Sequence, residues 1–398
     1  MSDTDALYEV GRLLIETDTV SHLANASLME NLADRLSQAG FRSKLQRWGE
    51  GEAAKANLVA VLGPAETDGL VVSGHLDTVP HADQPGWNRD PVRLGVEDER
   101  IYGRGTSDMK GFLAQCMVAA ERIDAARLRR PLAFVFTADE EIGCLGAGRL
   151  ATELPALMDE CPLPRLAWIG EPTSDQVCHA HKGVVVFELT VEGEGGHSSL
   201  PEAGVNAIAI TAGIARVMGE LQQERRTRSS PEAQQLFPDA PYTSFNFGKI
   251  HGGTASNMIA ESCTLLVSYR PLPDEDPRAF YEDARARVEA QGPKDWGSPG
   301  REARIRWGAP TVAPGLHSPR GSALEQALFA ELRVAESGGV PFCTDGGHLA
   351  AVGIDSLVCG PGDLEQAHQP NESISRAAFE GGADNIVRVV ERLCGEAS

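Results

Sequence analysis

The sequence has few basic residues for its length. Against 36 lysines and arginines stand 57 acidic residues, which gives a net charge of -21, and there is no extended Lys/Arg run. These two deficits argue against nucleic acid and anionic membrane surfaces as partners, because both attract positive charge. We therefore expect a small molecule as the ligand, and neither nucleic acid nor a membrane as a partner.

The sequence also lacks a hydrophobic stretch of membrane-spanning length, and its acidic N-terminus does not have the pattern of a secretory leader. Its eight cysteines are scattered without a CxxC pair, and several lie in apolar runs. Such cysteines are typical of reduced core residues rather than of a disulfide framework. The sequence thus predicts a cytoplasmic protein.

The chain does contain predicted strands that alternate with predicted helices. Continuous apolar runs such as 70–73, 131–137 and 166–169 are each followed by small or acidic residues. This alternation is typical of an α/β domain with a mostly parallel sheet that is buried on both faces. Because 398 residues exceed one ordinary core, we expect a second domain.

The pattern changes after residue 182. Residues 184–192 alternate apolar and polar side chains, as in a strand with one exposed face. The predicted order through residue 307 is β-α-β-β-α-β, which is typical of a ferredoxin-like unit. We therefore assign residues 183–310 to an inserted domain, and residues 1–182 and 311–398 to the parallel-sheet domain.

Five residues of the parallel-sheet domain have side chains suited to binding a metal ion, and four of them follow predicted strands. They are His75, Asp108, Glu141, Glu171 and His368. The carboxyl ends of parallel strands share one rim, so these side chains can converge there. Imidazole and carboxylate ligands suit zinc, and five ligands exceed what one catalytic zinc uses. Two ions bridged by Asp108 would use all five ligands.

Two further acidic residues suit supporting roles. Asp77 lies two residues after His75, so its carboxylate can orient the imidazole if the strand pleat persists. Glu140 can act as general base towards a metal-bound water, because zinc lowers the pKa of that water to roughly 7. Taken singly, a histidine after a strand is more often a hydrogen-bonded structural residue, and an adjacent glutamate pair is often solvated.

Five segments of the chain together carry a family resemblance. They are 75–77 (HLD), 105–111 (GTSDMKG), 138–141 (ADEE), 170–173 (GEPT) and 366–370 (QAHQP). In this order they resemble the dinuclear-zinc deacylases and exopeptidases, a family that includes acetylornithine deacetylase, succinyl-diaminopimelate desuccinylase, aminoacylase and glutamate carboxypeptidase. The chain is most similar to the acetylornithine deacetylase branch, through 180–183 (AHKG), 250–253 (IHGG), 270–273 (RPLP) and 359–362 (CGPG).

The resemblance implies roles for the candidate ligands. His75 and Glu171 would complete one metal site, and Glu141 and His368 the other, while Asp108 bridges the two ions. Asp77 would orient His75. Glu140 would be the general base and later the proton donor to the leaving amine. Family members often have a cis peptide after the bridging aspartate, here between Asp108 and Met109.

The resemblance also implies that the inserted domain dimerises or acts as a lid, and lends residues to the site. His197 would reach the site of a partner subunit and stabilise the tetrahedral oxyanion. Asn257 and Arg270 would hold the carboxylate of the substrate. Asp345 stands where acetylornithine deacetylases usually have glutamate, and we expect it to face the side chain of the substrate.

Together these features predict a dinuclear zinc amidohydrolase acting on linear amides, with cobalt or manganese as alternative metals. A metal-bridged water, with Glu140 as its base, would convert N2-acetyl-L-ornithine to L-ornithine and acetate, a step of arginine biosynthesis, in a cytoplasmic homodimer. One alternative is deacylation of another N-acyl amino acid, such as acetylcitrulline or succinyl-diaminopimelate. Others are a dipeptidase or carboxypeptidase of the same family and a non-catalytic metal-binding protein on the same scaffold.

Overall fold

A computed structural model describes residues 2–65, 67–291 and 301–396, and the chain divides into two compact units. Unit 1 consists of Met1–Ala180, Leu316–Gly338 and Thr344–Ser398, and unit 2 of His181–Gly315 and Gly339–Cys343.

The short segments 311–315 and 339–343 group with unit 2, although the sequence placed them in the parallel-sheet domain. The first contains β13 (Thr311–Ala313), which pairs with β9 (Val184–Glu192) of unit 2. In the second, a Cβ on Gly339 would contact Leu236 and Phe237, which also belong to unit 2. This pairing and this packing explain why the two segments group with unit 2.

Unit 1 is built on a nine-stranded sheet whose central strands are parallel. These parallel neighbours are, in spatial order, β6 (Leu132–Thr137), β3 (Leu70–His75), β7 (Leu166–Ile169) and β16 (Asp355–Val358). The remaining strands are β1 (Arg42–Trp48), β2 (Lys55–Leu62), β8 (Val177–His181), β14 (Leu316–His317) and β15 (Ser337–Val340). The predicted α/β class with a mostly parallel central sheet is confirmed, and β1, β2 and β8 add antiparallel pairs outside the parallel centre.

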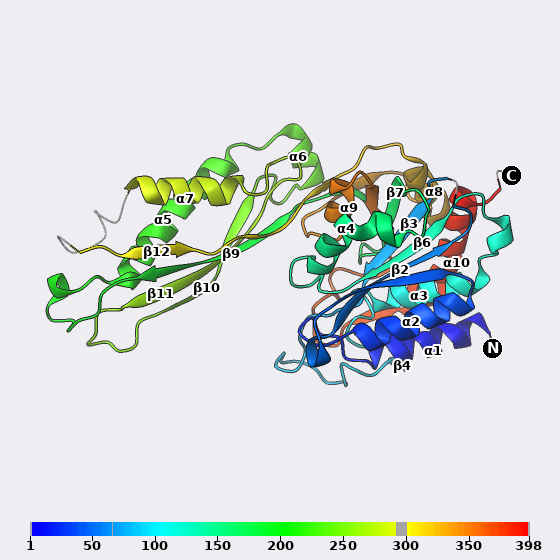
Figure 1. The fold of residues 1–398 in the computed structure, drawn as a ribbon, viewed down its shortest axis with the longest axis horizontal. Helices are drawn as coiled ribbons and strands as arrows, with labels where there is room; N and C mark the ends of the chain where they lie inside the picture. Colours follow the sequence, from blue (N-terminus) through cyan, green and yellow to red (C-terminus); the bar gives the residue numbers. More distant parts are fainter. Residues whose placement is uncertain (1, 66, 292–300, 397–398) are drawn as a thin grey trace. The chain divides into compact units, whose positions relative to one another are not determined.

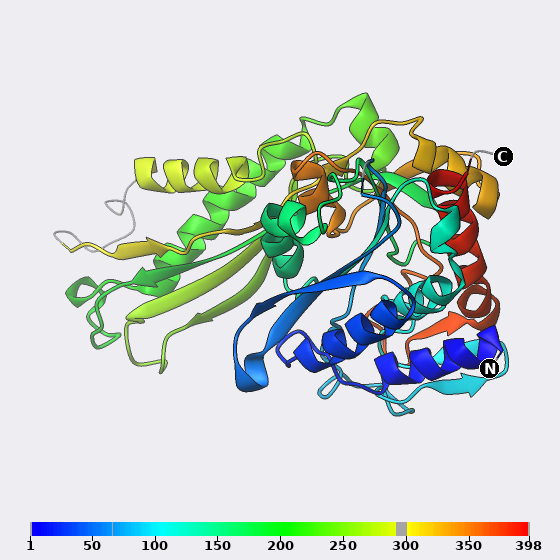
Figure 2. The same cartoon turned by 45° about the vertical axis from the view of Figure 1, so that its right-hand side comes forward.

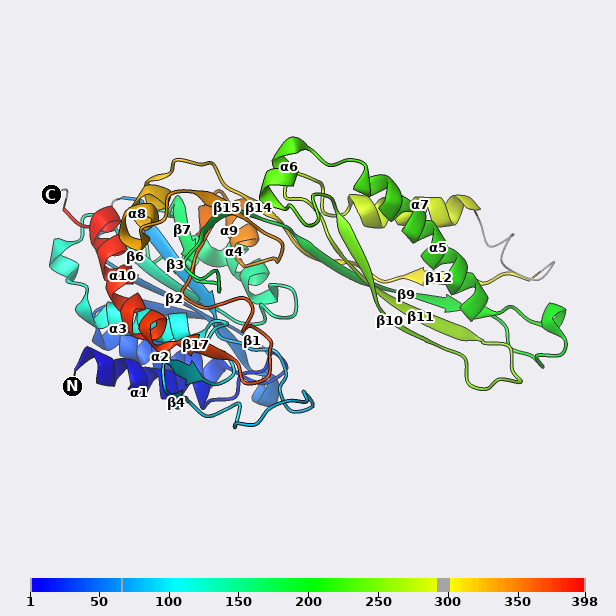
Figure 3. The same ribbon diagram turned by 180° about the vertical axis from the view of Figure 1, so that it is seen from behind.

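Helices cover both faces of this sheet (Figure 1). One face carries α1 (Asp3–Ile15), α2 (Ala26–Gln38), α3 (Lys110–Arg122), α8 (Ala323–Leu332) and α10 (Arg376–Cys394). The other carries α4 (Leu145–Leu157) and α9 (Gly346–Ala351). Figure 2 shows α1 and α2, in blue, near each other, and an ion pair of 2.9 Å between Glu9 and Arg35 joins them. Figure 3 shows α10 beside α3.

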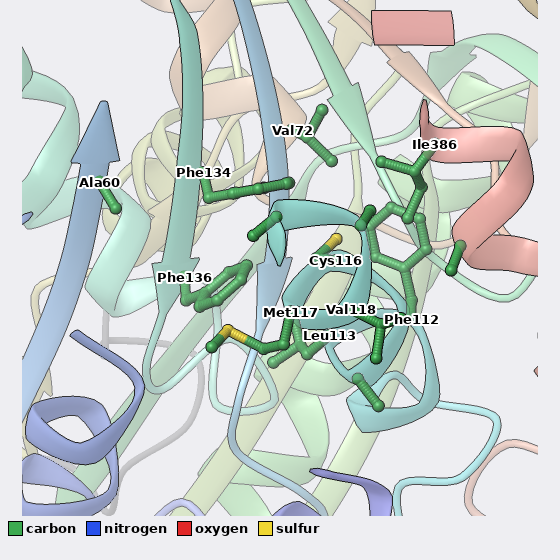
Figure 4. Close-up of a cluster of buried hydrophobic side chains, with 14 of the residues drawn as sticks. Ala60, Val72, Phe112, Leu113, Cys116, Met117, Val118, Phe134, Phe136 and Ile386 are labelled. Atoms are coloured by element: carbon green, nitrogen blue, oxygen red, sulfur yellow. The ribbon is translucent and has the colours of Figure 1, made fainter. Parts of the chain in front are cut away.

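The core of unit 1 lies between the central strands and α3 (Figure 4). Phe134 and Phe136 of β6 gather with Leu113 and Met117 of α3, and none of the four is more than 2% exposed. Because helices cover both faces, β3 and β6 are buried along their whole length, which explains the apolar run at the start of β3 and the almost entirely apolar sequence of β6. This packing fixes the ends of the strands, where the candidate ligands lie.

A small second sheet in unit 1 holds the segment that leads to Asp108. It consists of β17 (Ser373–Ser375), β5 (Arg100–Tyr102) and β4 (Gly95–Glu97). The pairing of β17 with β5 is antiparallel and joins two segments that are far apart in the sequence. The turn at Asp108 and the loop at His368 are therefore close neighbours in the fold.

Unit 2 has a five-stranded sheet in the order β10-β11-β9-β12, with β13 also paired to β9. The other strands are β10 (Ser244–Gly252), β11 (Ser262–Arg270) and β12 (Arg304–Trp307). The helices α5 (Ala207–Arg226) and α7 (Ala279–Gln291) contribute to a core with alternate residues of the strands. This order is the predicted ferredoxin-like arrangement.

Unit 2 also contains a short helix between α5 and β10. It is α6 (Pro231–Leu236), whose start is stabilised by Ser230, because the side chain of Ser230 accepts a hydrogen bond from the Ala233 N–H. All eight cysteines are buried. No helix in the described ranges is long and apolar enough to span a bilayer.

Candidate metal centre

Parallel strands bring several candidate residues to one rim of the sheet in unit 1. His75 is the last residue of β3 and is in register with Thr137, the last residue of β6. Glu140 and Glu141 follow β6 after two intervening residues. Glu171 follows β7, which is the other parallel neighbour of β3. The rim is the part of such a sheet where ligands bind.

Asp108 and His368 reach this rim from loops. The peptide bond between Asp108 and Met109 is cis, as the resemblance implied. A Cβ on Gly74 would lie 2.4 Å from Cε of Met109, so a larger residue beside His75 would require the side chain of Met109 to move. His368 has a φ of 62°, in the left-handed region.

The five candidate ligands form one cluster in which Asp108 lies between the two histidines. His75 Nε2 is 3.0 Å from Asp108 Oδ1, and His368 Nε2 is 3.2 Å from Asp108 Oδ2. Glu171 Oε2 is 3.9 Å from Nε2 of His75, and Glu141 Oε2 is 3.0 Å from Nε2 of His368. The cluster therefore has two halves that share Asp108.

Most of this cluster is shielded from solvent, and the shielding shifts its pKa values. His75, Asp108 and Glu171 are 1%, 7% and 4% exposed, whereas the side chain of His368 is 51% exposed. Burial raises the pKa of Glu171 and of Glu141, and the charge of Asp108 raises both further. Hydrogen bonds to Asp108 and Glu141 raise the pKa of His368 to about 10.

This donor set fits divalent cations. Buried carboxylates that raise one another's pKa concentrate negative charge, which a bound cation would stabilise. Ligand atoms of His75, Asp108 and Glu141 lie within 4.8 Å of one another, close enough to hold an ion. Mixed imidazole and carboxylate ligands suit zinc, and they also accept cobalt or manganese.

Asp77 orients His75 through a different atom from the one expected. Nδ1 of His75 donates to the main-chain carbonyl of Asp77 at 3.0 Å, whereas the nearer carboxylate oxygen is 3.7 Å away. The carboxylate instead accepts hydrogen bonds from the N–H groups of Glu140 (3.0 Å) and Glu141 (3.2 Å) and from the Ser21 hydroxyl (2.6 Å). The reason is that β3 ends at His75, so the pleat does not persist to Asp77.

Glu140 lies beside the ligands in an environment that raises its pKa. Burial has the largest effect, and the charge of Glu171 adds to it. The thiol of Cys144 donates a hydrogen bond to Oε1 of Glu140 at a distance of 3.2 Å. A carboxylate with a raised pKa is a stronger base once ionised, which suits a proton-transfer role.

Asp345 lies at the start of α9 and is 1% exposed. Its Oδ2 atom accepts a hydrogen bond from Thr137 Oγ1 at 2.5 Å. Its carboxylate also groups with Glu140 and Cys144, with ligand-type atoms within 4.8 Å of one another. Asp345 therefore lies against the candidate base, and its contact with a substrate side chain stays a prediction.

Two of the candidate residues in unit 2 lie together. Ser198 N donates to the carbonyl of Asn257 at 3.0 Å, and His197 forms an isolated bridge with Met258. Ser199 N donates to Nδ1 of His197 at 3.2 Å, so in the neutral ring Nε2 carries the proton. The exposed His197 can therefore donate from Nε2, as an oxyanion donor must.

Arg270 lies at the opposite end of the same sheet. It is the last residue of β11 and pairs with Ser244, whereas His197 and Asn257 lie beyond Ser262 at the other end. At about 3.4 Å per residue, the two ends of β11 are roughly 27 Å apart. One copy of unit 2 therefore cannot direct both Asn257 and Arg270 to one substrate carboxylate, and the two can share a substrate only if they come from different copies.

Several residues that support the cluster were missed in the sequence. They are Ser21, Lys55 and Thr137. Lys55, for example, forms a buried ion pair of 2.7 Å with Asp139, which precedes Glu140. No local motif marks these residues, because most of their partners are distant in the sequence, up to 208 positions for the Thr137 bond.

Comparisons with known proteins confirm the resemblance seen in the motifs. The family model described as peptidase family M20/M25/M40 matches residues 71–392. An acetylornithine deacetylase from Salmonella heidelberg (strain SL476) is 36% identical over 395 residues, which cover 97% of each chain.

Solved structures show the same fold. The M20 family metallo-carboxypeptidase Sso-CP2 from Sulfolobus solfataricus has a TM-score of 0.77 at 17% identity and covers 99% of each chain. The YXEP protein from Bacillus subtilis, described as a dinuclear metal binding peptidase, has a TM-score of 0.64 at 16% identity over 98% of this chain and 97% of that one. With the family model matching most of its length and a curated relative matching nearly all of it, the chain belongs to peptidase family M20/M25/M40.

Proposed function

We propose that, within the metal-dependent deacylase and peptidase chemistry of its family, this chain converts N2-acetyl-L-ornithine to L-ornithine and acetate. The deacetylase that is 36% identical over 97% of each chain supports this substrate. The main observation in favour of metal-dependent hydrolysis is the position of Asp108 between His75 and His368, with Glu140 beside them. This reaction would serve arginine biosynthesis in the cytoplasm.

The cluster would hold two divalent ions, with zinc as the metal that suits it best. One ion would be held by His75 and Glu171 and the other by Glu141 and His368, with Asp108 shared. When bound, such ions polarise a carbonyl oxygen and lower the pKa of water to roughly 7.

Glu140 would move the protons of the reaction. Its carboxylate would take a proton from the attacking water and give it to the nitrogen of the leaving amine as the C–N bond breaks. The net reaction consumes one water and yields acetate and the free amino acid. Asp77 supports this role, because its carboxylate holds the N–H groups of Glu140 and Glu141.

A second copy of the chain would complete the site. His197 and Asn257 of one copy would act on the substrate that Arg270 of the other copy binds, which agrees with their positions at opposite ends of β11. The edge strand β10 exposes Phe247 (40%) and Ile250 (56%), and a second β10 could cover them. We therefore propose a homodimer formed through unit 2.

A panel of substrates, with detection of the released amine, tests the proposed function. N2-acetylornithine is expected to give the highest kcat/KM of a set that includes acetylcitrulline, succinyl-diaminopimelate and unblocked dipeptides. Preference for a longer acyl group or side chain would reassign the substrate. Preference for dipeptides would indicate a peptidase, and absence of any turnover with metal bound would indicate a binding protein.

A further inference from the structure

A chain of buried polar contacts lies next to the candidate ligands in unit 1. The carboxylate of Glu372 is fully buried, and its Oε1 accepts hydrogen bonds from the N–H groups of Ser107 (2.9 Å) and Asp108 (3.1 Å). Its Oε2 forms an ion pair of 2.8 Å with Nη1 of Arg104, which is itself 2% exposed. Glu372 therefore holds the backbone of the turn that presents Asp108.

Arg104 is also linked to His368, through the side chain of Gln84. Nη2 of Arg104 donates to Oε1 of Gln84, and so does the indole N–H of Trp87, at 3.0 Å. Because two donors face Oε1, the amide group of Gln84 must direct its Nε2 to the other side, where it donates to the main-chain carbonyl of His368 at 2.7 Å.

The backbone conformation of His368 is one that neighbouring residues must stabilise. Its φ of 62° is one that residues with a Cβ rarely adopt, and such conformations persist only where the surroundings hold them. Nearby, Asn371 accepts from the N–H of Asn88 and donates to the carbonyl of Gly86, both at 3.0 Å. The loops at 84–88 and 368–372 are therefore fastened to each other at two points.

We propose that Gln84, Arg104 and Glu372, called the ligand clamp below, position Asp108 and His368, and that Gln84, through its contact with His368, sets the affinity for the one ion that His368 would hold. This proposal rests on the proposed two-metal centre. A buried ion pair is a costly way to stabilise a fold, and apolar residues of similar volume often serve as well. The contacts of this pair with the backbone of one ligand, and through Gln84 with that of another, indicate a positioning role.

Cobalt binding to metal-free protein, measured by calorimetry and by visible absorption, tests the ligand clamp. Gln84→Ala removes both amide contacts, whereas Gln84→Glu keeps an acceptor for Arg104 and removes the donor to His368. Both variants are expected to bind one ion as the wild type does and to lose roughly 10–100-fold in affinity for the other. The absorption of that ion should change as well.

Arg89→Gln is the matched control. Arg89 follows the same loop, and its side chain contacts Glu97, the Asn88 side chain and the Tyr102 ring, none of which belongs to the ligand clamp. This variant is expected to bind both ions with wild-type affinity. Unchanged affinities in both Gln84 variants would overturn the ligand clamp but not the two-metal centre. An equal loss of affinity for both ions, together with lower thermal stability of the metal-free protein, would have the same meaning. A wild type that binds fewer than two ions would overturn the two-metal centre, and the ligand clamp with it.

Discussion

At the scale of single residues, the site depends on which atom of each side chain faces the cluster. Asp108 directs one carboxylate oxygen to each of the two histidines. The main-chain carbonyl of Asp77 accepts the Nδ1 proton of His75, so the Nε2 atom that faces Asp108 is the one with a lone pair in the neutral ring. Glu140 differs from these residues. Its carboxylate accepts a hydrogen bond from the Cys144 thiol, and we propose it as the base rather than as a metal ligand.

Replacing Glu140 tests whether this residue acts as the base and not as a metal ligand. Glu140→Gln should retain both metal ions, because the ligands are unchanged, and should lower kcat by at least ~100-fold, as loss of a general base does. Turnover of N2-acetylornithine and metal content by mass spectrometry are the measurements. Glu153→Gln, at an exposed position of α4, serves as the control and should match the wild type. Near-normal turnover in Glu140→Gln would refute the assignment.

Lys182 in unit 2 allows a test by pH. Burial lowers its pKa to about 8 from an ordinary value of 10.5, although its Nζ donates to the carbonyl of Tyr242 at 2.7 Å. Between these two pH values the unfolded chain binds a proton that the folded chain has lost, so the contribution of Lys182 to the free energy of unfolding should increase as pH rises.

Urea unfolding of the wild type and of Lys182→Met at pH 8 and at pH 10.5 measures this contribution. The difference between the two proteins should shift in favour of the wild type at the higher pH. A difference that stays constant, or shifts the other way, would contradict the lowered pKa.

At the scale of elements, strands buried on both faces could be predicted well. β3, β6 and β7 have continuous apolar sequences because helices cover both sides of the sheet, and the candidate ligands at their ends followed from that prediction. Short elements such as α6 and α9 were missed, because six residues carry little periodic signal.

Side-chain direction beyond a strand end was also not predictable. The expected role of the Asp77 carboxylate assumed a pleat that in fact stops at His75. Contacts such as Cys144 with Glu140, or Thr137 with Asp345, depend on how loops turn after the strands. No spacing in the sequence specifies those turns.

The packing of β6 against α3 supports the rim and can be tested by a cavity. Phe136→Ala should lower the free energy of unfolding by about 3–5 kcal/mol, because the residue is fully buried beside Met117. Val96→Ala, at a residue that is 38% exposed on β4, should change it by less than about 0.5 kcal/mol. Chemical denaturation measures both, and equal effects would contradict the described core.

At the scale of the whole molecule, each unit has its own core and its own candidate residues. All five proposed ligands and Glu140 belong to unit 1, whereas His197, Asn257 and Arg270 belong to unit 2. The length of β11 keeps Asn257 and Arg270 of one copy apart, so the proposed chemistry requires a second copy. The resemblance predicts a dimer, and the strand geometry gives a reason why the proposed chemistry would need one.

A charge on the edge strand tests the dimer. Ile250→Lys should produce monomers in analytical ultracentrifugation, because a buried lysine would oppose pairing of two β10 edges. Since Ile250 is 56% exposed in one copy, the variant should fold and bind metal, but its turnover should fall. Val96→Lys, at an exposed apolar residue of unit 1, should remain dimeric and active. A wild type that is monomeric and active would contradict the proposal.

The most direct measurement is anomalous diffraction at the zinc edge, on crystals of the zinc-loaded protein. It tests whether separate segments of the chain hold two ions that share one carboxylate. Two peaks are expected. One should contact His75 and Glu171, the other Glu141 and His368, and both should contact Asp108. A single peak, or peaks that do not share Asp108, would contradict the two-metal centre.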